Sequence, residues 1–232
     1  MTASLTELVP DQVWLEEYPV RIAGARLLTR MTVLRSQGGG VFLHSPVVMD
    51  DATRTAIERL GPVRAIIAPS NCHHLFIAHA QQAFPSAPTY GVEGVEAKRP
   101  DLRFDALIGN EPPPLWAGQM DQAIVGNRIM REVDFLHRAS RTLVVTDLVE
   151  NFRDETPGTN HALRGIIKLL GMWGKPKPAP ELRWFTRDRK AAREALEKIL
   201  AWDFDRIVLA HGEPILHEPK AAVRAAWRWL LG

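Results

Sequence analysis

The sequence predicts an α+β protein of four layers, an αββα sandwich in which two mixed β-sheets are flanked by helices. Short segments of alternating apolar residues predict strands, and segments with helical periodicity separate several of them. Each half of the chain begins with predicted strands and closes with a helix–strand–helix unit. Two such halves can bury their sheets against each other with the helices outside, which predicts the four layers.

In the first half of the chain, strands are expected to alternate with helices after an irregular start over residues 1–25. The glycines at 38–40 separate two strand-like segments and predict a hairpin. Asp50 can cap the next helix, and Gly61 can end it. Strands are predicted at 26–36, 41–43, 64–68 and 89–91, and helices at about 51–60, 74–84 and 92–99.

The second half of the chain contains two proline-rich segments, 111–114 and 174–180, which predict stiff loops. Strands are predicted at 122–125, 133–136, 142–145 and 206–210, and helices at 156–170, 187–201 and 219–231. The last of these helices has apolar residues at helical spacing, so one of its faces is expected to be buried.

Composition and charge indicate a single globular domain over residues 1–232, with a helical insert at about 151–185. Hydrophobic residues make up 46% of the chain, charged residues 24%, and the formal net charge is +2. This small charge gives no indication of a nucleic acid or a membrane as a partner. No apolar run could span a bilayer, and residues 1–10 lack the pattern of a signal peptide. We therefore expect a cytoplasmic protein that acts on a small molecule.

Polar side chains follow three of the predicted strands at the point where each strand ends. His73 and His74 follow one strand, Asp147 follows a second, and His211 follows the last. Strands that lie side by side would bring these turns to one edge of the sheets. Three imidazoles and a carboxylate suit zinc, and also iron or manganese. The sequence therefore predicts one divalent metal ion, most readily zinc, at His73, His74, Asp147 and His211, and it assigns no catalytic residue.

The turn Pro69-Ser70-Asn71-Cys72-His73-His74 resembles the first metal motif of the metallo-β-lactamase superfamily, His-x-His-x-Asp-His. When the last histidine of that motif is placed on His74, its aspartate falls on His73. Its second and first histidines then fall on Asn71 and Pro69. The superfamily has an αββα fold, so the resemblance implies the same four layers as the strand and helix pattern.

Two later segments are also similar to motifs of this superfamily. The strand that ends in Asp147 resembles the one that carries the aspartate bridging two metals, and Ala210-His211-Gly212 resembles the late histidine motif. The middle histidine motif should fall near 125–127, where this chain has no histidine. The resemblance thus implies that one metal site is lost and the other kept, so we expect one metal ion or none. Segments such as 99–104 resemble an uncharacterised bacterial branch of the superfamily.

Two functions remain open at this point. The first is a metal-dependent hydrolase of unknown substrate, and the second is a catalytically inactive binding module of the same fold without metal. In the superfamily the motif aspartate helps to orient or deprotonate the attacking water, and here His73 takes its place. His73 could serve as a general base if it binds no metal. Cys72 is a third candidate as a thiol nucleophile, although a small hydrophobe in a turn is the more common role.

The other candidate residues have structural interpretations. His44 and His137 lie at or near predicted strand ends and are expected to be structural. The aromatic segments 172–174 and 184–185 can either line a substrate pocket or pack a helical insert onto the core.

Overall fold

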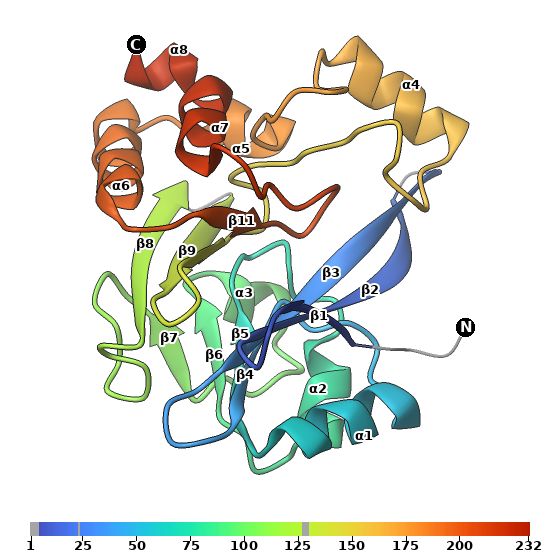
Figure 1. Ribbon diagram of the computed structural model, residues 1–232, viewed down its shortest axis with the longest axis vertical. Coiled ribbons are helices and arrows are strands. Elements are labelled where there is room, and N and C mark those ends of the chain that lie inside the picture. Colours follow the sequence, from blue (N-terminus) through green and yellow to red (C-terminus); the bar gives the residue numbers. More distant parts are fainter. Residues whose placement is uncertain (1–4, 23, 127–129) are drawn as a thin grey trace.

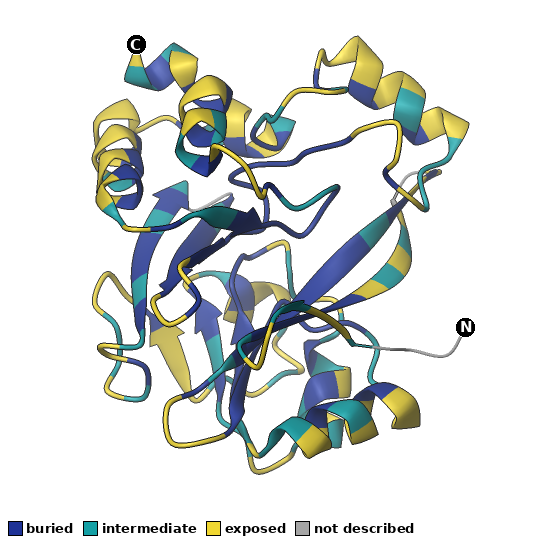
Figure 2. Ribbon diagram, viewed as in Figure 1, coloured by how far each residue is buried: buried dark blue, intermediate teal, exposed yellow. Residues whose placement is uncertain are grey.

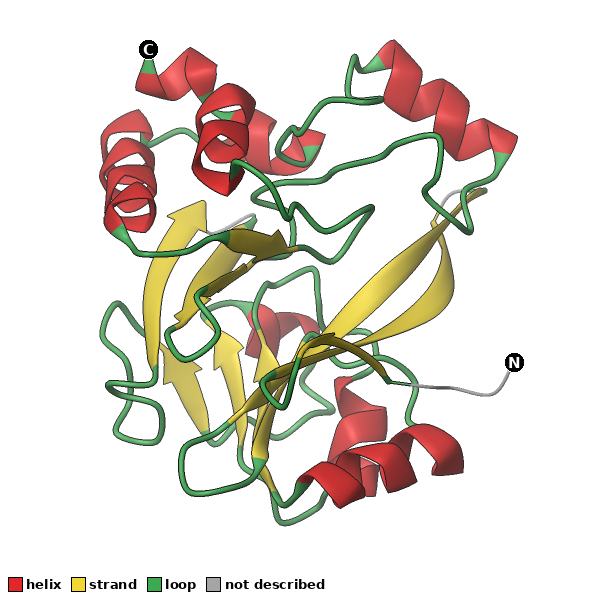
Figure 3. Cartoon of the chain, in the orientation of Figure 1, coloured by secondary structure: helices red, strands yellow, loops and turns green. Residues whose placement is uncertain are grey.

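Two β-sheets pack against each other in the computed structural model, which describes residues 5–22, 24–126 and 130–232 (Figure 1, Figure 3). The first sheet follows chain order: β1 (Thr6–Val9), β2 (Val13–Ile22), β3 (Ala25–Arg35), β4 (Val41–His44), β5 (Val63–Ala68), β6 (Thr89–Val92) and β7 (Ala106–Ile108). The second runs from β11 (Arg206–Val208) through β10 (Thr142–Val144) and β9 (Arg131–His137) to β8 (Met120–Gly126). Both sheets contain parallel and antiparallel pairs.

Helices cover the outer face of each sheet. The first sheet carries α1 (Asp51–Leu60), α2 (Ile77–Ala83) and α3 (Val95–Lys98). The second carries α5 (Pro180–Phe185), α6 (Arg189–Ala201), α7 (Pro219–Ala226) and α8 (Arg228–Leu231). A further helix, α4 (His161–Leu169), packs on β3. The predicted αββα sandwich is confirmed, and α4 and α5 lie in the segment expected as a helical insert.

Adjacent residues in the central strands belong to different apolar cores. Ile67 of β5 packs between the two sheets, whereas Ile66 packs beneath α1 and α2. Val144 of β10 likewise lies between the sheets, whereas Leu143 lies beneath α6 and α7. Because successive side chains of a strand point to opposite faces, strands that are apolar on both faces must be covered on both sides. Figure 2 shows these strands as buried along most of their length.

Residues 1–25 were expected to be irregular, and this prediction is wrong for β1 and β2. β2 pairs with β3 along its whole length, from Val13 opposite Leu34 to Ile22 opposite Ala25. The segment contains Pro19 and several charged residues, so it lacks the clean alternation that predicts a strand. The long neighbouring strand β3 supplies the pairing partner. The resulting β2–β3 ribbon extends past β4 and forms one wall beside the site described below (Figure 1).

Other differences from the predicted elements are local. β7 and α5 were not predicted, and α5 begins at Pro180, a position where a helix tolerates proline because its first N–H groups have no partner. The helix expected from 74 begins only at Ile77, and the final helix divides into α7 and α8 at Trp227. Among the described residues, no helix has the length and apolar character needed to cross a bilayer.

Candidate metal centre

The ends of three strands meet at one edge of the sandwich. β10 and β11 are parallel neighbours with Val144 opposite Val208, so Asp147 and His211 both lie three residues beyond paired positions. His73 arrives from the first sheet on the turn after β5. Backbone hydrogen bonds hold that turn against β9, because the N–H of Val133 donates to the carbonyl of Pro69. The sheet register thus brings together side chains that lie far apart in the sequence.

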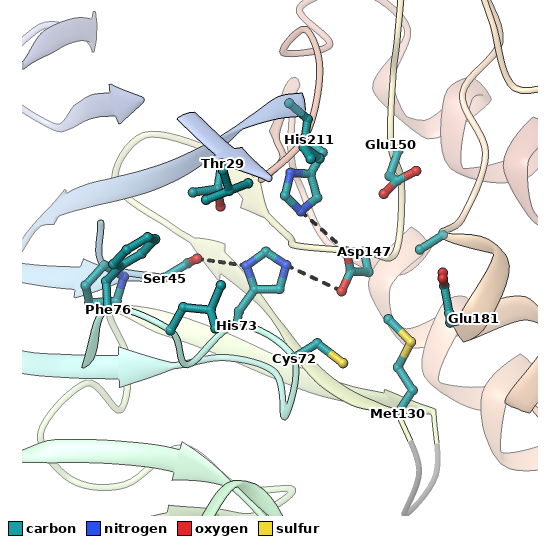
Figure 4. A pocket seen from close by; sticks show the side chains of 15 residues that line it. Thr29, Ser45, Cys72, His73, Phe76, Met130, Asp147, Glu150, Glu181 and His211 are labelled. Carbon is teal, nitrogen blue, oxygen red and sulfur yellow. Dashed lines mark hydrogen bonds and ion pairs between the residues drawn. The ribbon is translucent and has the colours of Figure 1, made fainter. Parts of the chain in front are cut away.

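His73, Asp147 and His211 form a compact group of candidate metal ligands (Figure 4). One ligand atom from each lies within 4.8 Å of the others. Nε2 of His73 is 3.5 Å from Oδ2 of Asp147, and Nε2 of His211 is 4.0 Å from Oδ1 of the same carboxylate. The two rings are tilted, with centroids 5.1 Å apart. Three of the four predicted ligands are therefore brought together.

Each imidazole is anchored through its other nitrogen. Nδ1 of His211 donates to the backbone carbonyl of Leu28 at 3.0 Å, which leaves the lone pair on Nε2. Nδ1 of His73 is hydrogen-bonded to Oγ of Ser45, also at 3.0 Å. Ser45 has a φ of +52°, in the left-handed region that residues other than glycine rarely adopt. Such partners fix the orientation of a histidine ligand, as in known metal sites.

The charges within the group are unevenly distributed. Burial by itself would lower the pKa of His73, but the charge of Asp147 and a hydrogen bond to it raise that pKa above its usual value. Burial and the neighbouring His73 lower the pKa of His211 to about 4. Burial opposes ionisation of Asp147, yet the two histidines hold its pKa below the usual range. Without a metal, these shifts favour a charged His73–Asp147 pair beside a neutral His211.

Glu132, on β9, supports this centre from behind and was not predicted from the sequence. Its fully buried carboxylate accepts the backbone N–H groups of both Thr146 and Asp147. Asp134 lies on the same face of β9, and burial together with the charge of Glu132 raises its pKa well above the usual value. The signal in the sequence was two acids separated by one apolar residue within a strand, which places both on one face.

The turn that carries His211 is held by Arg30 of β3, which the sequence also did not indicate. The buried Arg30 guanidinium donates to the carbonyls of Leu209 and Gly212, on either side of the histidine. It also pairs with Glu17 of β2. A buried guanidinium is costly unless its N–H groups are satisfied, so these contacts tie the turn firmly to the β2–β3 ribbon.

Gly212 makes a close backbone approach beside the centre. Its φ is +93°, and a Cβ at this position would lie 2.3 Å from the carbonyl oxygen of Asn151. We expect Gly212→Ala to lower the free energy of unfolding by more than about 3 kcal/mol, because backbone atoms cannot yield as a flexible side chain can. Gly174→Ala is the control, since φ is +71° there but no atom lies within 4 Å, and it should cost only about 1–2 kcal/mol. Equal losses in urea unfolding would contradict this expectation.

His74, the fourth predicted ligand, lies outside the group of three. Its carbonyl accepts a hydrogen bond from Arg99, and its buried Nδ1 has no hydrogen-bond partner among the described residues. Burial and the charges of Arg99 and Lys98 lower its pKa. The middle-motif position near 125–127 includes Asn127, which lies outside the described residues.

The remaining candidates have mainly structural contacts. His137 bridges Ser140 and the carbonyl of Arg35, and His44 packs edge-on against a phenylalanine ring with its pKa lowered to about 3 by burial and the nearby His73. Burial and the charge of Asp147 raise the pKa of the Cys72 thiol. That shift disfavours the thiolate and therefore the thiol-nucleophile hypothesis.

A cavity of about 290 Å³ opens beside the centre. Its walls come from the β2–β3 ribbon, the turn before α2, and the segment between β10 and α5. Met172 packs beneath α4 instead of lining this cavity, and Trp184 is 65% exposed. Of the predicted insert, Ala179 and Glu181 reach the cavity wall.

The two packed sheets, with their site at the strand ends, define a protein of the metallo-β-lactamase fold. The chain is similar over its full length to the DIM-1 metallo-β-lactamase, with a TM-score of 0.68, 13% identity and 97% of that chain covered. An Erythrobacter litoralis metallo-β-lactamase gives a TM-score of 0.68 at 12% identity, over 99% of this chain and 97% of that one. FIM-1 from Pseudomonas aeruginosa, in its mono-zinc form, gives 0.63 at 12% identity, over 100% and 98%.

The chain belongs to the family described as Domain of unknown function (DUF4336), whose family model matches residues 10–165. No curated protein matches it. The matched segment includes His73 and Asp147 but ends before His211, and it contains β2 to β10.

Proposed function

We propose that the protein is a metal-dependent hydrolase that holds one divalent ion, most readily zinc, between His73, Asp147 and His211. The observation that carries this proposal is the orientation of the two imidazoles, both anchored at Nδ1 with Nε2 directed at one carboxylate. Ligand atoms around tetrahedral zinc are about 3.4 Å apart, given bonds of about 2.0–2.1 Å. The separations of 3.5 and 4.0 Å, each to a different oxygen of Asp147, are longer than that value, and one ligand atom from each residue lies within 4.8 Å of the others.

A single ion is favoured because the positions that the family motif assigns to another metal have different contacts here. Pro69 accepts the N–H of Val133 through its carbonyl, and Oδ1 of Asn71 accepts the N–H of Arg131. Both residues thereby join the first sheet to β9. The description of FIM-1 as a mono-zinc form is consistent with one ion on this fold.

The chemistry follows from the ligand set and the enclosure. When bound, a divalent ion supplies a Lewis acid that can polarise a carbonyl or phosphoryl oxygen. Asp147 and the neutral His211 offer lone pairs at neutral pH, and His73 does so after losing its proton. Apolar side chains line much of the adjoining cavity and can contact an apolar part of the substrate. Hydrolysis of a small, partly apolar molecule is the reaction that this arrangement suits.

The proposal is tested by metal content and by chelator. Protein purified without chelator should contain about one zinc, iron or manganese ion per chain. Removal of that ion should lower the melting temperature, because a ligand that binds only the native state stabilises it. Absence of stoichiometric metal would refute the hydrolase proposal.

A metal-free binding module is the second candidate, and one observation favours it. The positive charge of His73 can balance the negative charge of Asp147 without a metal, since each residue shifts the pKa of the other toward its charged form. A melting temperature that is unchanged by chelator, in a protein without bound metal, would favour this module.

Metal affinity should depend on pH through one proton, that of His73. Its pKa is raised, so below that pKa a metal ion must displace a proton from Nε2. His211 has a pKa of about 4 and stays neutral. The affinity for zinc should therefore rise about tenfold per pH unit between about pH 5 and about pH 6.5. Competitive titration with a chromophoric chelator measures this slope; a slope of zero, or of two protons, would contradict it.

A further inference from the structure

The cavity contains a carboxyl group that the three-residue metal centre does not use. Glu150, three residues after Asp147, lines the cavity and is 8% exposed. Its side chain has no hydrogen bond or ion pair with any described residue. Figure 4 shows it on the same side of the cavity as Asp147, with Glu181 of α5 nearby. A buried carboxyl directed into a cavity without a partner is costly, and it indicates a ligand that completes its contacts.

The neighbouring charges that shift the pKa of this carboxyl are all negative, and the positive His73 beside the cavity is paired with Asp147. Glu181 also lines the cavity, and no lysine or arginine does so among the described residues. Burial, followed by the charges of Asp147, Glu181 and Glu132, raises the pKa of Glu150 well above its usual value. An anionic ligand would add to this repulsion, whereas a cation beside Glu150 and Glu181 would relieve it.

Apolar side chains form two walls of the cavity. Val20 and Leu27 form one wall from the β2–β3 ribbon, and Leu75 and Phe76 form another from the turn before α2. Met130 closes the side near β9. Walls of this kind suit an organic body, and the volume of about 290 Å³ limits it to a small molecule.

We propose that Glu150 and Glu181 bind the ammonium group of a small amphipathic amine whose apolar part lies against Val20, Leu27 and Phe76. That this amine is the substrate of the hydrolase rests on the proposed function. A second metal ion fits these two carboxylates less well than an ammonium group does. Neither belongs to the group of described ligand atoms that lie within 4.8 Å of one another, and the walls beside them are apolar.

The test compares three probes of equal chain length: hexylammonium, 1-hexanol and hexanoate. Calorimetric titration is carried out on the full chain, both after metal removal and with zinc added. In the metal-free protein we expect hexylammonium to bind at least about tenfold more tightly than 1-hexanol, and hexanoate to bind most weakly. The double substitution Glu150→Gln with Glu181→Gln should remove the preference for ammonium and leave 1-hexanol affinity unchanged. Glu194→Gln, on the exposed face of α6, is the matched control and should change nothing.

Several results would overturn this inference. They are binding of hexanoate to the metal-free protein as tight as that of hexylammonium, absence of binding by all three probes, and an ammonium preference that survives in the double variant. Loss of zinc on Glu150→Gln alone would make Glu150 a metal ligand and would also overturn it. Because the probe comparison is made on wild type, a variant that fails to fold does not remove the test. A wild-type protein that binds no metal but prefers hexylammonium would refute the hydrolase and support the ammonium site.

Discussion

His211→Ala is expected to weaken zinc binding by about 100-fold or more, because it removes one of the three proposed protein ligands from the centre. His211 contributes a neutral imidazole whose Nε2 is preoriented by the hydrogen bond to Leu28. The measurement is equilibrium dialysis against zinc, followed by elemental analysis of the protein. Circular dichroism should show an unchanged fold, since the backbone contacts of Arg30 with Leu209 and Gly212 do not involve the imidazole.

His74→Ala is the matched control for this substitution. His74 follows His73 directly but lies outside the group of three, so its removal should leave zinc affinity within about twofold of wild type. If His74→Ala weakened binding as much as His211→Ala, the four-ligand set predicted from the sequence would be correct. If neither substitution affected zinc binding, the centre itself would be wrongly assigned.

Glu132→Ala is expected to lower the free energy of unfolding by about 3–5 kcal/mol. The fully buried carboxylate accepts the N–H groups of Thr146 and Asp147, and its removal leaves both donors without a partner. The loss should appear as a lower urea midpoint with an unchanged slope. These contacts also hold the backbone of Asp147 in position, so zinc affinity should fall as well.

Asp134→Asn tests the other residue of the buried Glu132–Asp134 pair. Burial and the charge of Glu132 raise the pKa of Asp134 well above its usual value, which favours the uncharged carboxyl, and an amide replaces that form closely. We expect a cost of about 1 kcal/mol or less, well below that of Glu132→Ala. A larger loss for Asp134→Asn than for Glu132→Ala would show that the charge in this pair is on Asp134.

Much of the fold could be predicted because it depends on local patterns. The runs around Ile66 and Leu143 are apolar on both faces, and this requires a layer on each side of the strand. β2 could not be predicted in this way. Pro19 and its charged neighbours conceal the strand, and its stability comes from pairing with β3. A contact with a strand elsewhere in the chain leaves no periodic signal in the segment itself.

The candidate centre was predicted only in part, for a similar reason. His73, Asp147 and His211 were recognisable because each follows a strand, and parallel pairing of β10 with β11 aligns two of them. The orientation of His74 depends on the turn after β5, which tertiary hydrogen bonds to β9 shape. Spacing along the chain cannot show which of two adjacent imidazoles faces a distant carboxylate.

By itself, the sequence predicted the four layers, the positions of most strands and helices, and the three residues that the structure brings together as a candidate metal centre. These features follow from side-chain periodicity and from polar residues at strand ends, which are properties of neighbouring residues. Only the tertiary structure placed Glu132 behind Asp147, Arg30 around the His211 turn, and Glu150 in the cavity. These are buried ionisable groups. The partners that stabilise Glu132 and Arg30 come from other segments of the chain. These contacts, and the lack of a partner for Glu150, are defined only once the chain has folded.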